Sequence, residues 1–447
     1  MNKVLVDFSK NAGKVKDFNC INNGPAGSVV RKVSNFPSYE RAHIPYARLH
    51  DSAFSTLYGG EYSVDVHRVF PNFDADENDP ESYLFGPTDA YLEKITSVGT
   101  GIYYRLGAAI EHGYKRGTYP PKDYLKWARI CEHIIRHYTE GWANGFRYDI
   151  KYWEIWNEPE CTNADGSRPC WQGTNQQFAD FFITVFRYLK DKFPHLKIGG
   201  PAISTCWAED FWRTFMPAIR DAGVRPDFLS YHRYGKTVED FVATVHKANE
   251  WLEEYGYTGT ETHLNEWNYV RGWQGENFLH TIDSIKGQKG AAFVAGVMCA
   301  LHPESVDMLM YYEGRPSAYC GLWDTDTHRD LPTYYTYLAF DALKQLGTAV
   351  YGENGDHLYA LGATDGKNGG ILVSHFDQED GSPTREGVIS VRGIDLAEGE
   401  SLRVRVKLLD ESHRLDVIRE DIFTAGSFDI PLSFKPYDVC YLELSRE

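Results

Sequence analysis

Two glutamates stand where the sequence predicts the ends of β-strands, and a pair of carboxyl groups placed in this way can cleave an acetal. Glu158 ends the aromatic and apolar segment 151–157 and is followed by Pro159, which cannot continue strand pairing. Glu266 ends a second such segment, 262–265. Carboxyl groups about 5 to 5.5 Å apart suit a double displacement, whereas about 6.5 to 9.5 Å leaves room for a water and inverts the product.

The interval between the two glutamates corresponds to roughly three βα units of a parallel barrel. Glu158 would then close the fourth strand and Glu266 the seventh, and these strands face each other across the barrel mouth. Because the carboxyl ends of barrel strands form the active-site face, both side chains are expected there. Glu154 lies earlier on the same strand as Glu158 and is expected to be structural.

Short apolar or aromatic runs alternate with longer helical patterns through residues 15–345, which is typical of an α/β fold. Helices are expected at 121–138, 178–190 and 238–255. Since eight strands close a (β/α)8 TIM barrel, we assign residues 15–345 to a catalytic barrel. The candidate strands cover residues 18–22, 46–50, 101–106, 152–156, 197–200, 228–232, 262–266 and 308–312.

Three further regions flank or interrupt this pattern. Residues 346–447 show alternating runs broken by Asn-Gly and Asp-Gly pairs, which indicates an accessory C-terminal β-sandwich domain. Residues 1–14 include an alternating run that is expected to join that sandwich. The segment 58–87, rich in Asp, Asn and Pro, is expected to be an elaborated loop above the barrel mouth or a disordered decoration.

The composition narrows the possible partners. Asp and Glu total 63 against 46 Lys and Arg, a net charge of −17, which argues against nucleic acid and anionic membranes as partners. No stretch approaches the roughly 18 consecutive apolar residues of a membrane span. The first residues lack the features of a signal peptide, so we expect a cytoplasmic protein. Aromatic residues reach 15%, and such rings stack on sugars, although large cores use them too.

The cysteines and histidines give no sign of a metal centre. Cys161 and Cys170 share one loop, so a bridge between them and two reduced thiols are both open, the latter being usual in a cytosolic enzyme. His133 and His137 have the spacing of a zinc-binding helix, but the glutamate that accompanies that motif is missing. We expect neither a metal nor a cofactor.

The two glutamate motifs resemble those of the retaining clan of barrel glycosidases, and most of all glycoside hydrolase family 39. The motifs are Trp156-Asn157-Glu158-Pro159 and Asn265-Glu266-Trp267-Asn268, with Ala47-Arg48-Leu49-His50 on the second strand and Tyr231-His232-Arg233-Tyr234 on the sixth. The resemblance covers nearly the whole chain. It implies that Glu266 is the nucleophile that attacks the anomeric carbon of an oligosaccharide, while Glu158 is the general acid/base.

The same resemblance implies residues that hold the sugar. Asn157 is expected to donate to the 2-hydroxyl, with a strand-end turn as its alternative role. His232 and Tyr234 look like the family's pair near the nucleophile, and a core histidine is the alternative for His232. His50 and Asp51 are expected to hold hydroxyls of the cleaved sugar, or Asp51 to cap a helix.

The eighth strand is expected to complete the sugar site. Tyr312 and Glu313 would supply a hydroxyl acceptor there, and Trp323 a stacking wall. The segment 311–315 departs from the family's usual pattern, which leaves the identity of the substrate open. Sandwich domains often mediate assembly, so a homo-oligomer is a possible state.

The resemblance favours a β-xylosidase, followed by an α-L-arabinofuranosidase, because both sugars present corresponding anomeric geometry to the nucleophile. An α-L-iduronidase ranks third, since only Arg315 near the eighth strand is an obvious basic partner for a uronate. The long loops favour exo action. A non-catalytic carbohydrate-binding barrel is the alternative from another class, but such a protein would be free to lose one of the two carboxylates.

Overall fold

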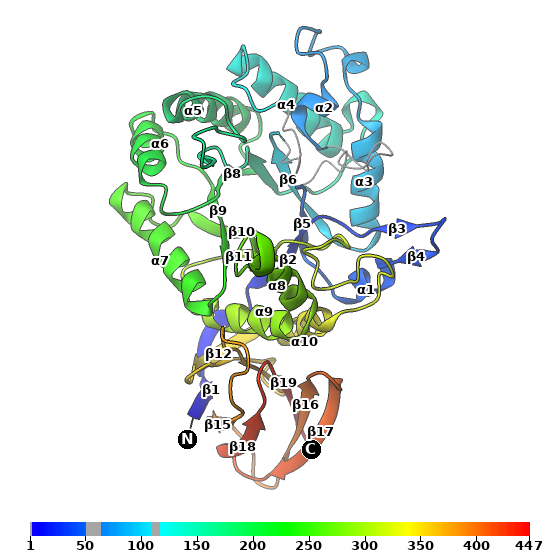
Figure 1. The fold of residues 1–447 in the computed structure, drawn as a ribbon, viewed down its shortest axis with the longest axis vertical. Coiled ribbons are helices and arrows are strands. Elements are labelled where there is room, and N and C mark those ends of the chain that lie inside the picture. The colour runs from blue at the N-terminus through cyan, green and yellow to red at the C-terminus, as the bar shows by residue number, and fades with distance from the viewer. Residues whose placement is uncertain (1, 51–63, 109–116) are drawn as a thin grey trace.

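The protein consists of a barrel with a smaller β-sheet structure beneath it (Figure 1). The computed structural model describes residues 2–50, 64–108 and 117–447. Asp51 therefore lies outside the described residues. Among the helices of the described ranges, none has the length and apolarity that crossing a bilayer requires.

Eight parallel strands close the barrel, and each coincides with one of the predicted strands. They are β2 (Asp17–Asn22), β5 (Tyr46–Arg48), β6 (Gly101–Leu106), β7 (Tyr152–Ile155), β8 (Lys197–Ile203), β9 (Phe228–Gly235), β10 (Glu261–Tyr269) and β11 (Met308–Tyr311). Strands of a parallel barrel are buried on both faces, so short continuous apolar runs identify them in the sequence. The predicted TIM barrel is confirmed.

Helices surround the barrel, as the alternation of patterns predicts (Figure 1). They are α1 (Phe36–Arg41), α2 (Val66–Val69), α3 (Gly86–Ser97), α4 (Tyr124–Thr139), α5 (Asn175–Lys192), α6 (Glu209–Asp221), α7 (Val238–Glu254), α8 (Gly275–Lys286), α9 (Gln288–Leu301) and α10 (Pro332–Leu346), with 3-10 turns η1 (Pro80–Ser82) and η2 (Trp142–Asn144). Helix α4 begins later than predicted, because the Asp123 side chain accepts the Lys126 N–H and caps it there.

The remaining strands form a two-stranded sheet and a nine-stranded sheet. The small sheet pairs β3 (Gly27–Ser28) with β4 (Val33–Ser34). The large sheet has the order β17–β16–β19–β14–β13–β12–β1–β15–β18. Its strands are β1 (Asn2–Lys14), β12 (Thr348–Glu353), β13 (Leu358–Thr364), β14 (Gly369–His375), β15 (Arg385–Arg392), β16 (Leu402–Leu409), β17 (Arg414–Phe423), β18 (Phe428–Phe434) and β19 (Val439–Arg446).

Strand β1 lies inside the nine-stranded sheet although it comes first in the chain. It pairs antiparallel with β12 and parallel with β15. Val4 and Val6 of β1 are fully buried in an apolar cluster together with Ile430 of β18 and Leu442 of β19. The sheet thus wraps around its own core, in agreement with the expected β-sandwich.

Helices α9 and α10 join the barrel to this sandwich. Phe293 of α9 and Phe340 of α10 belong to the same core cluster as Leu361 and Leu372 of the sheet. Because apolar side chains from both bodies share that cluster, the sandwich is packed against the helices α9 and α10 of the barrel (Figure 1).

Residues 64–87, the described part of the segment expected as a loop or a decoration, are packed against the barrel helices. The ring of Phe85 stacks on His137 of α4 with centroids 3.6 Å apart. Tyr83 contacts Phe85 on one side and Trp142 of η2 on another. These ring contacts bury Tyr83 and Phe85, so this part of the segment is an ordered component of the barrel wall.

Candidate active site

The turn after β7 presents Glu158 at the barrel mouth. The strand ends at Ile155, and both Trp156 and Glu158 adopt a left-handed backbone, with φ of 76° and 48°. Such a conformation costs non-glycine residues on the order of 1 kcal/mol or more, so surrounding contacts must hold it. The Trp156 N–H donates to Leu106 O and the Glu158 N–H to Ala202 O, which ties the turn to both neighbouring strands.

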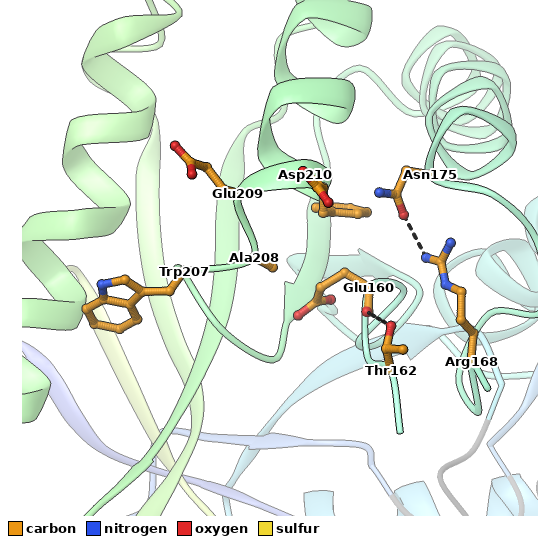
Figure 2. A pocket seen from close by; sticks show the side chains of 9 residues that line it. Glu160, Thr162, Arg168, Asn175, Trp207, Ala208, Glu209 and Asp210 are labelled. Carbon is orange, nitrogen blue, oxygen red and sulfur yellow. Dashed lines mark hydrogen bonds between the residues drawn. The ribbon is translucent and has the colours of Figure 1, made fainter. Parts of the chain in front are cut away.

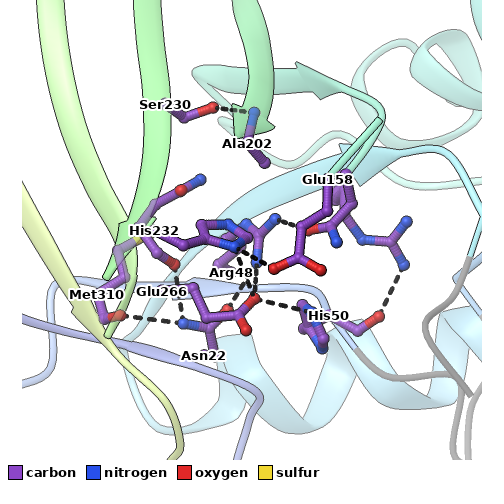
Figure 3. A network of polar contacts seen from close by, with 12 residues as sticks. Asn22, Arg48, His50, Glu158, Ala202, Ser230, His232, Glu266 and Met310 are labelled. Carbon is purple, nitrogen blue, oxygen red and sulfur yellow. Dashed lines mark hydrogen bonds and ion pairs between the residues drawn. The ribbon is translucent and has the colours of Figure 1, made fainter. Parts of the chain in front are cut away.

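Glu266 lies within β10 rather than at its end, since the strand continues to Tyr269. The register of β10 against β9 shifts between Leu264 and Glu266. Such an irregularity re-aims a side chain, and here it accompanies a Glu266 carboxylate that is directed into the mouth (Figure 3).

The two predicted carboxyl groups meet with His232 between them. One oxygen of Glu158, one of Glu266 and a ring nitrogen of His232 all lie within 4.8 Å of one another. His232 Nδ1 is 2.8 Å from Glu158 Oε1 and 3.6 Å from Glu266 Oε2. The side chains of Glu266 and Glu158 are only 6% and 14% exposed, so the pair is largely shielded from water.

Glu266 is held in its ionised form. Burial by itself would raise the pKa of Glu266, but the charges of His232, His50 and Arg48 outweigh it and hold the pKa well below the usual value. His50 Nε2 lies 2.9 Å from Glu266 Oε2, and Tyr234 donates its hydroxyl to Oε1 at 2.6 Å. An anionic carboxylate fixed by donors on both oxygens is suited to nucleophilic attack.

Arg48 connects the two glutamate motifs, a role that was not predicted. Its side chain is fully buried and donates to Glu266 at 3.2 Å, to Glu154 at 2.8 Å and to Asn157 at 2.6 Å (Figure 3). Glu154 also accepts from Ser230 and Asn265. Glu154 therefore occupies a structural position below the mouth, as expected.

Asn157, His232, Tyr234 and His50 are all brought to the carboxyl pair. Asn157 accepts from Arg48 through Oδ1, and its buried Nδ2 has no hydrogen-bond partner among the described residues. A donor left in this way can reach a ligand hydroxyl in the mouth. Tyr312 of the eighth barrel strand's end packs its ring edge-on against His50, with centroids 5.1 Å apart.

Two residues that were predicted to complete the sugar site near the eighth strand are buried. Glu313 is 2% exposed and already accepts hydrogen bonds from Asn23 and Ser317 on its two oxygens. Trp323 is fully buried, and its ring stacks on Tyr39 at 5.4 Å. Trp323 is thus part of the core, and the expectation that it forms a stacking wall for a sugar is corrected.

An exposed tryptophan lies beside Tyr234, the residue whose hydroxyl donates to Glu266. Trp273, in the segment between β10 and α8, is 57% exposed, and its ring lies 5.1 Å from that of Tyr234. Sequence reasoning missed it because exposure, the property that distinguishes Trp273 from Trp323, depends on tertiary packing.

The cysteine pair in the loop after β7 lies beside Glu158. All eight cysteines, which fall within the described ranges, are thiols that form no disulfide bond with one another. The sulfur atoms of Cys161 and Cys170 and one oxygen of Glu158 lie within 4.8 Å of one another. The question of a bridge is therefore answered in favour of two thiols next to the acid/base candidate.

Comparisons with known proteins match part of the chain to a family of glycosidases. The model of glycosyl hydrolases family 39 matches residues 61–259. A β-xylosidase of Geobacillus stearothermophilus is 34% identical over 125 residues, which span 27% of this chain and 23% of that protein.

Solved structures share the fold over the whole length. A glucosidase from Croceicoccus marinus superimposes with a TM-score of 0.79 at 20% identity, covering 100% of this chain and 99% of that one. A monomeric β-xylosidase from Caulobacter crescentus CB15 gives 0.71 at 16% identity, covering 100% and 99%. An α-L-arabinofuranosidase from Thermotoga maritima gives 0.64 at 15% identity, covering 99% of each chain. With the family match over residues 61–259 and the two glutamate motifs joined at one barrel mouth, the chain is similar to glycosyl hydrolases family 39.

Proposed function

We propose that the protein is a retaining, exo-acting glycoside hydrolase that removes pentose units from oligosaccharides, with β-xylosidase activity favoured. The observation that carries this proposal is the approach of the Glu158 and Glu266 oxygens to within 4.8 Å. This separation fits the double-displacement spacing of about 5 to 5.5 Å and falls short of the roughly 6.5 to 9.5 Å that inversion needs.

The proposed reaction uses each glutamate once in each half. Ionised Glu266 attacks the anomeric carbon and forms a glycosyl ester, while the bond from that carbon to the departing oxygen breaks and Glu158 gives that oxygen its proton. Water then attacks the same carbon, Glu158 takes its proton, and Glu266 leaves as a carboxylate. Asn157, through its unpartnered Nδ2, would donate to the sugar 2-hydroxyl in both transition states.

The proposed sugar rests on the relatives, and the proposed exo action rests on the burial of the two carboxyl groups. The related segment of the β-xylosidase supports xylose, and the structural likeness to an α-L-arabinofuranosidase supports arabinose as the second candidate. The nearly enclosed carboxyl groups support exo action, because a chain end enters such a site more readily than the middle of a polymer.

A panel of nitrophenyl glycosides tests the proposal. Wild type, Glu266→Gln and the matched control Glu261→Gln would be assayed on β-xylopyranoside, α-L-arabinofuranoside, α-L-arabinopyranoside, β-glucoside and β-galactoside. Glu261 lies at the opposite end of β10 and pairs with Lys197. We expect release from the β-xyloside, lost in Glu266→Gln and kept in the control. Activity retained in Glu266→Gln would overturn the assignment of the nucleophile, and silence of the wild type on the whole panel would contradict the proposed function.

A further inference from the structure

A pocket opens beside the acid/base candidate, between the loop that follows β7 and the loop that follows β8 (Figure 2). Its volume is about 440 Å³, within the range of about 300 to 1,000 Å³ typical of ligand pockets. The first loop contributes Glu160, Thr162 and Arg168, the second contributes Trp207, and the start of α6 contributes Asp210. Both loops lie at the carboxyl ends of barrel strands, the face that carries the glutamate pair.

The pocket contains a buried carboxyl group with an unused oxygen. Glu160 is 8% exposed, and its Oε1 accepts from the Ser204 hydroxyl at 2.6 Å and from the Thr205 N–H at 3.1 Å. Its Oε2 is buried and has no hydrogen-bond partner among the described residues. Leaving a buried polar atom unsatisfied is costly, so such an atom in a pocket indicates a ligand group that completes it.

The wall of this pocket is held rigidly. The Arg168 guanidinium donates to Pro159 O at 2.6 Å, to Asn175 Oδ1 at 2.8 Å and to Gly173 O at 2.7 Å. These bonds tie the loop after β7 to the start of α5. Glu160 is therefore positioned before any ligand arrives, which lowers the entropic cost of binding.

An exposed aromatic ring lies on the side of the pocket that the loop after β8 forms. Trp207 is 48% exposed, and the Arg233 guanidinium lies 5.4 Å from its ring centroid. Arg233 in turn follows His232, which contacts Glu158. A large indole kept at the surface by a neighbouring cation offers an apolar face of the kind that stacks on sugar rings.

Glu160 relates this pocket to the acid/base candidate Glu158. Glu160 follows Glu158 by two positions in the chain. The two carboxyl groups are also within electrostatic reach, because burial and then the charge of Glu158 raise the pKa of Glu160, to about 7. In the proposed reaction Glu158 protonates the departing oxygen, so the departing part of the substrate must lie next to Glu158.

We infer that this pocket is a binding site for the leaving-group sugar of an oligosaccharide, in which Trp207 stacks on the ring and Glu160 accepts a hydroxyl. This inference rests on the proposed glycosidase function and deepens it. The enzyme would then select substrates by the sugar that it releases from the Glu158 side, as well as by the sugar that Glu266 attacks.

The test compares two substrates that share a glycone and differ in leaving group, nitrophenyl β-xyloside and β-1,4-linked xylotriose. In Trp207→Ala we expect KM for xylotriose to rise about three- to tenfold, the usual worth of one aromatic stacking contact, while kcat/KM for the nitrophenyl glycoside stays within about twofold. Glu160→Gln, which replaces the unused acceptor by a donor, should raise KM for xylotriose selectively as well.

Tyr351→Ala is the matched control. Like Trp207, Tyr351 is an exposed ring (39%) with a cation beside it, the Lys10 ammonium at 4.8 Å from the ring centroid, but it lies on the sandwich. Equal effects of Trp207→Ala on both substrates, or no effect on either, would overturn the leaving-group site. Calorimetric binding of xylotriose to Glu266→Gln, with and without Trp207→Ala, separates this inference from the proposed function because it needs no turnover. Unchanged affinity in the double variant would also overturn the inference.

Discussion

The Tyr234 hydroxyl donates to Glu266 Oε1 at 2.6 Å, from the strand next to the one that carries Glu266. The hydroxyl holds one oxygen of the buried carboxylate while His50 and Arg48 hold the other. The orientation of the proposed nucleophile therefore depends on donors from two barrel strands, Tyr234 of β9 and Arg48 and His50 in and just after β5.

Removing this donor should slow the reaction and shift its pH profile. In Tyr234→Phe we expect kcat/KM to fall about ten- to hundredfold, because a hydrogen bond to a charged group is lost. Since that bond favours the ionised form, its loss raises the pKa of Glu266, and the acidic limb of the kcat/KM profile moves to higher pH. The control is Tyr231→Phe on the same strand, whose hydroxyl forms no hydrogen bond with either glutamate in the described structure. An unchanged rate and limb in Tyr234→Phe would contradict this role.

The proposed role of Glu158 as the general acid can be tested by comparing the rates of substrates with different leaving groups. Glu158→Ala should lose about 10² to 10⁴ in rate on substrates with poor leaving groups and far less on activated phenols, which depart without a proton. Azide should enter the space left by the carboxyl group and give a glycosyl azide of retained configuration, detected by NMR. Equal losses with all leaving groups would reassign Glu158.

The buried ion pairs of Arg48 should matter more for stability than pairs on the surface. Arg48→Met leaves Glu154 and Glu266 without their buried cation, so we expect a loss of about 3 to 5 kcal/mol in the free energy of unfolding. Arg213→Met breaks ion pairs with Glu209 and Glu254 whose side chains are about half exposed, and should cost less than about 1 kcal/mol. Urea denaturation of both variants checks the contrast, and similar losses would contradict it.

Glu160 should make stability depend on pH in the neutral range. Burial raises the pKa of Glu160 from its ordinary 4.5 to about 7, so the folded protein holds this proton more tightly than the unfolded chain. The resulting stabilisation is fully present below about pH 4.5 and is lost as the pH rises through about 7.

Glu160→Gln cannot release a proton at this position, so its Tm should fall less than that of the wild type between pH 5 and pH 8, measured by thermal unfolding at intervals. The comparison variant is Glu209→Gln, which removes a 64% exposed carboxyl group at the rim of the same pocket. Parallel Tm curves for wild type and Glu160→Gln would show that Glu160 does not titrate in this range.

The barrel could be predicted because its strands are buried on both sides and therefore appear as continuous apolar runs in the sequence. The glutamate pair followed from the same pattern, since polar residues after such runs meet at one end of a parallel barrel. Both glutamates were expected at regular strand ends, and their local backbone geometry was not predicted. Glu158 lies in a left-handed turn, and Glu266 lies at a register shift within β10.

The surroundings of the pair were harder to foresee. Arg48 sits fully buried in β5, and nothing in its sequence neighbourhood indicates which anions from other strands will compensate its charge. Trp323 and Trp273 are alike as residues, yet the first is enclosed by Tyr39 and the second is open to solvent. Contacts between segments distant in the chain determine the partners of Arg48 and the exposure of the two tryptophans, and a single sequence does not reveal such contacts.

The place of β1 in the large sheet has a consequence for biosynthesis. On the ribosome β1 emerges well before its neighbours β12 and β15, which begin only at Thr348 and Arg385. The nascent chain must therefore carry Val4 and Val6 without their final burial while the entire barrel is translated. Pairing of β1 with both neighbours can therefore follow only after the barrel has been translated, and until then β1 is a strand open to capture by chaperones.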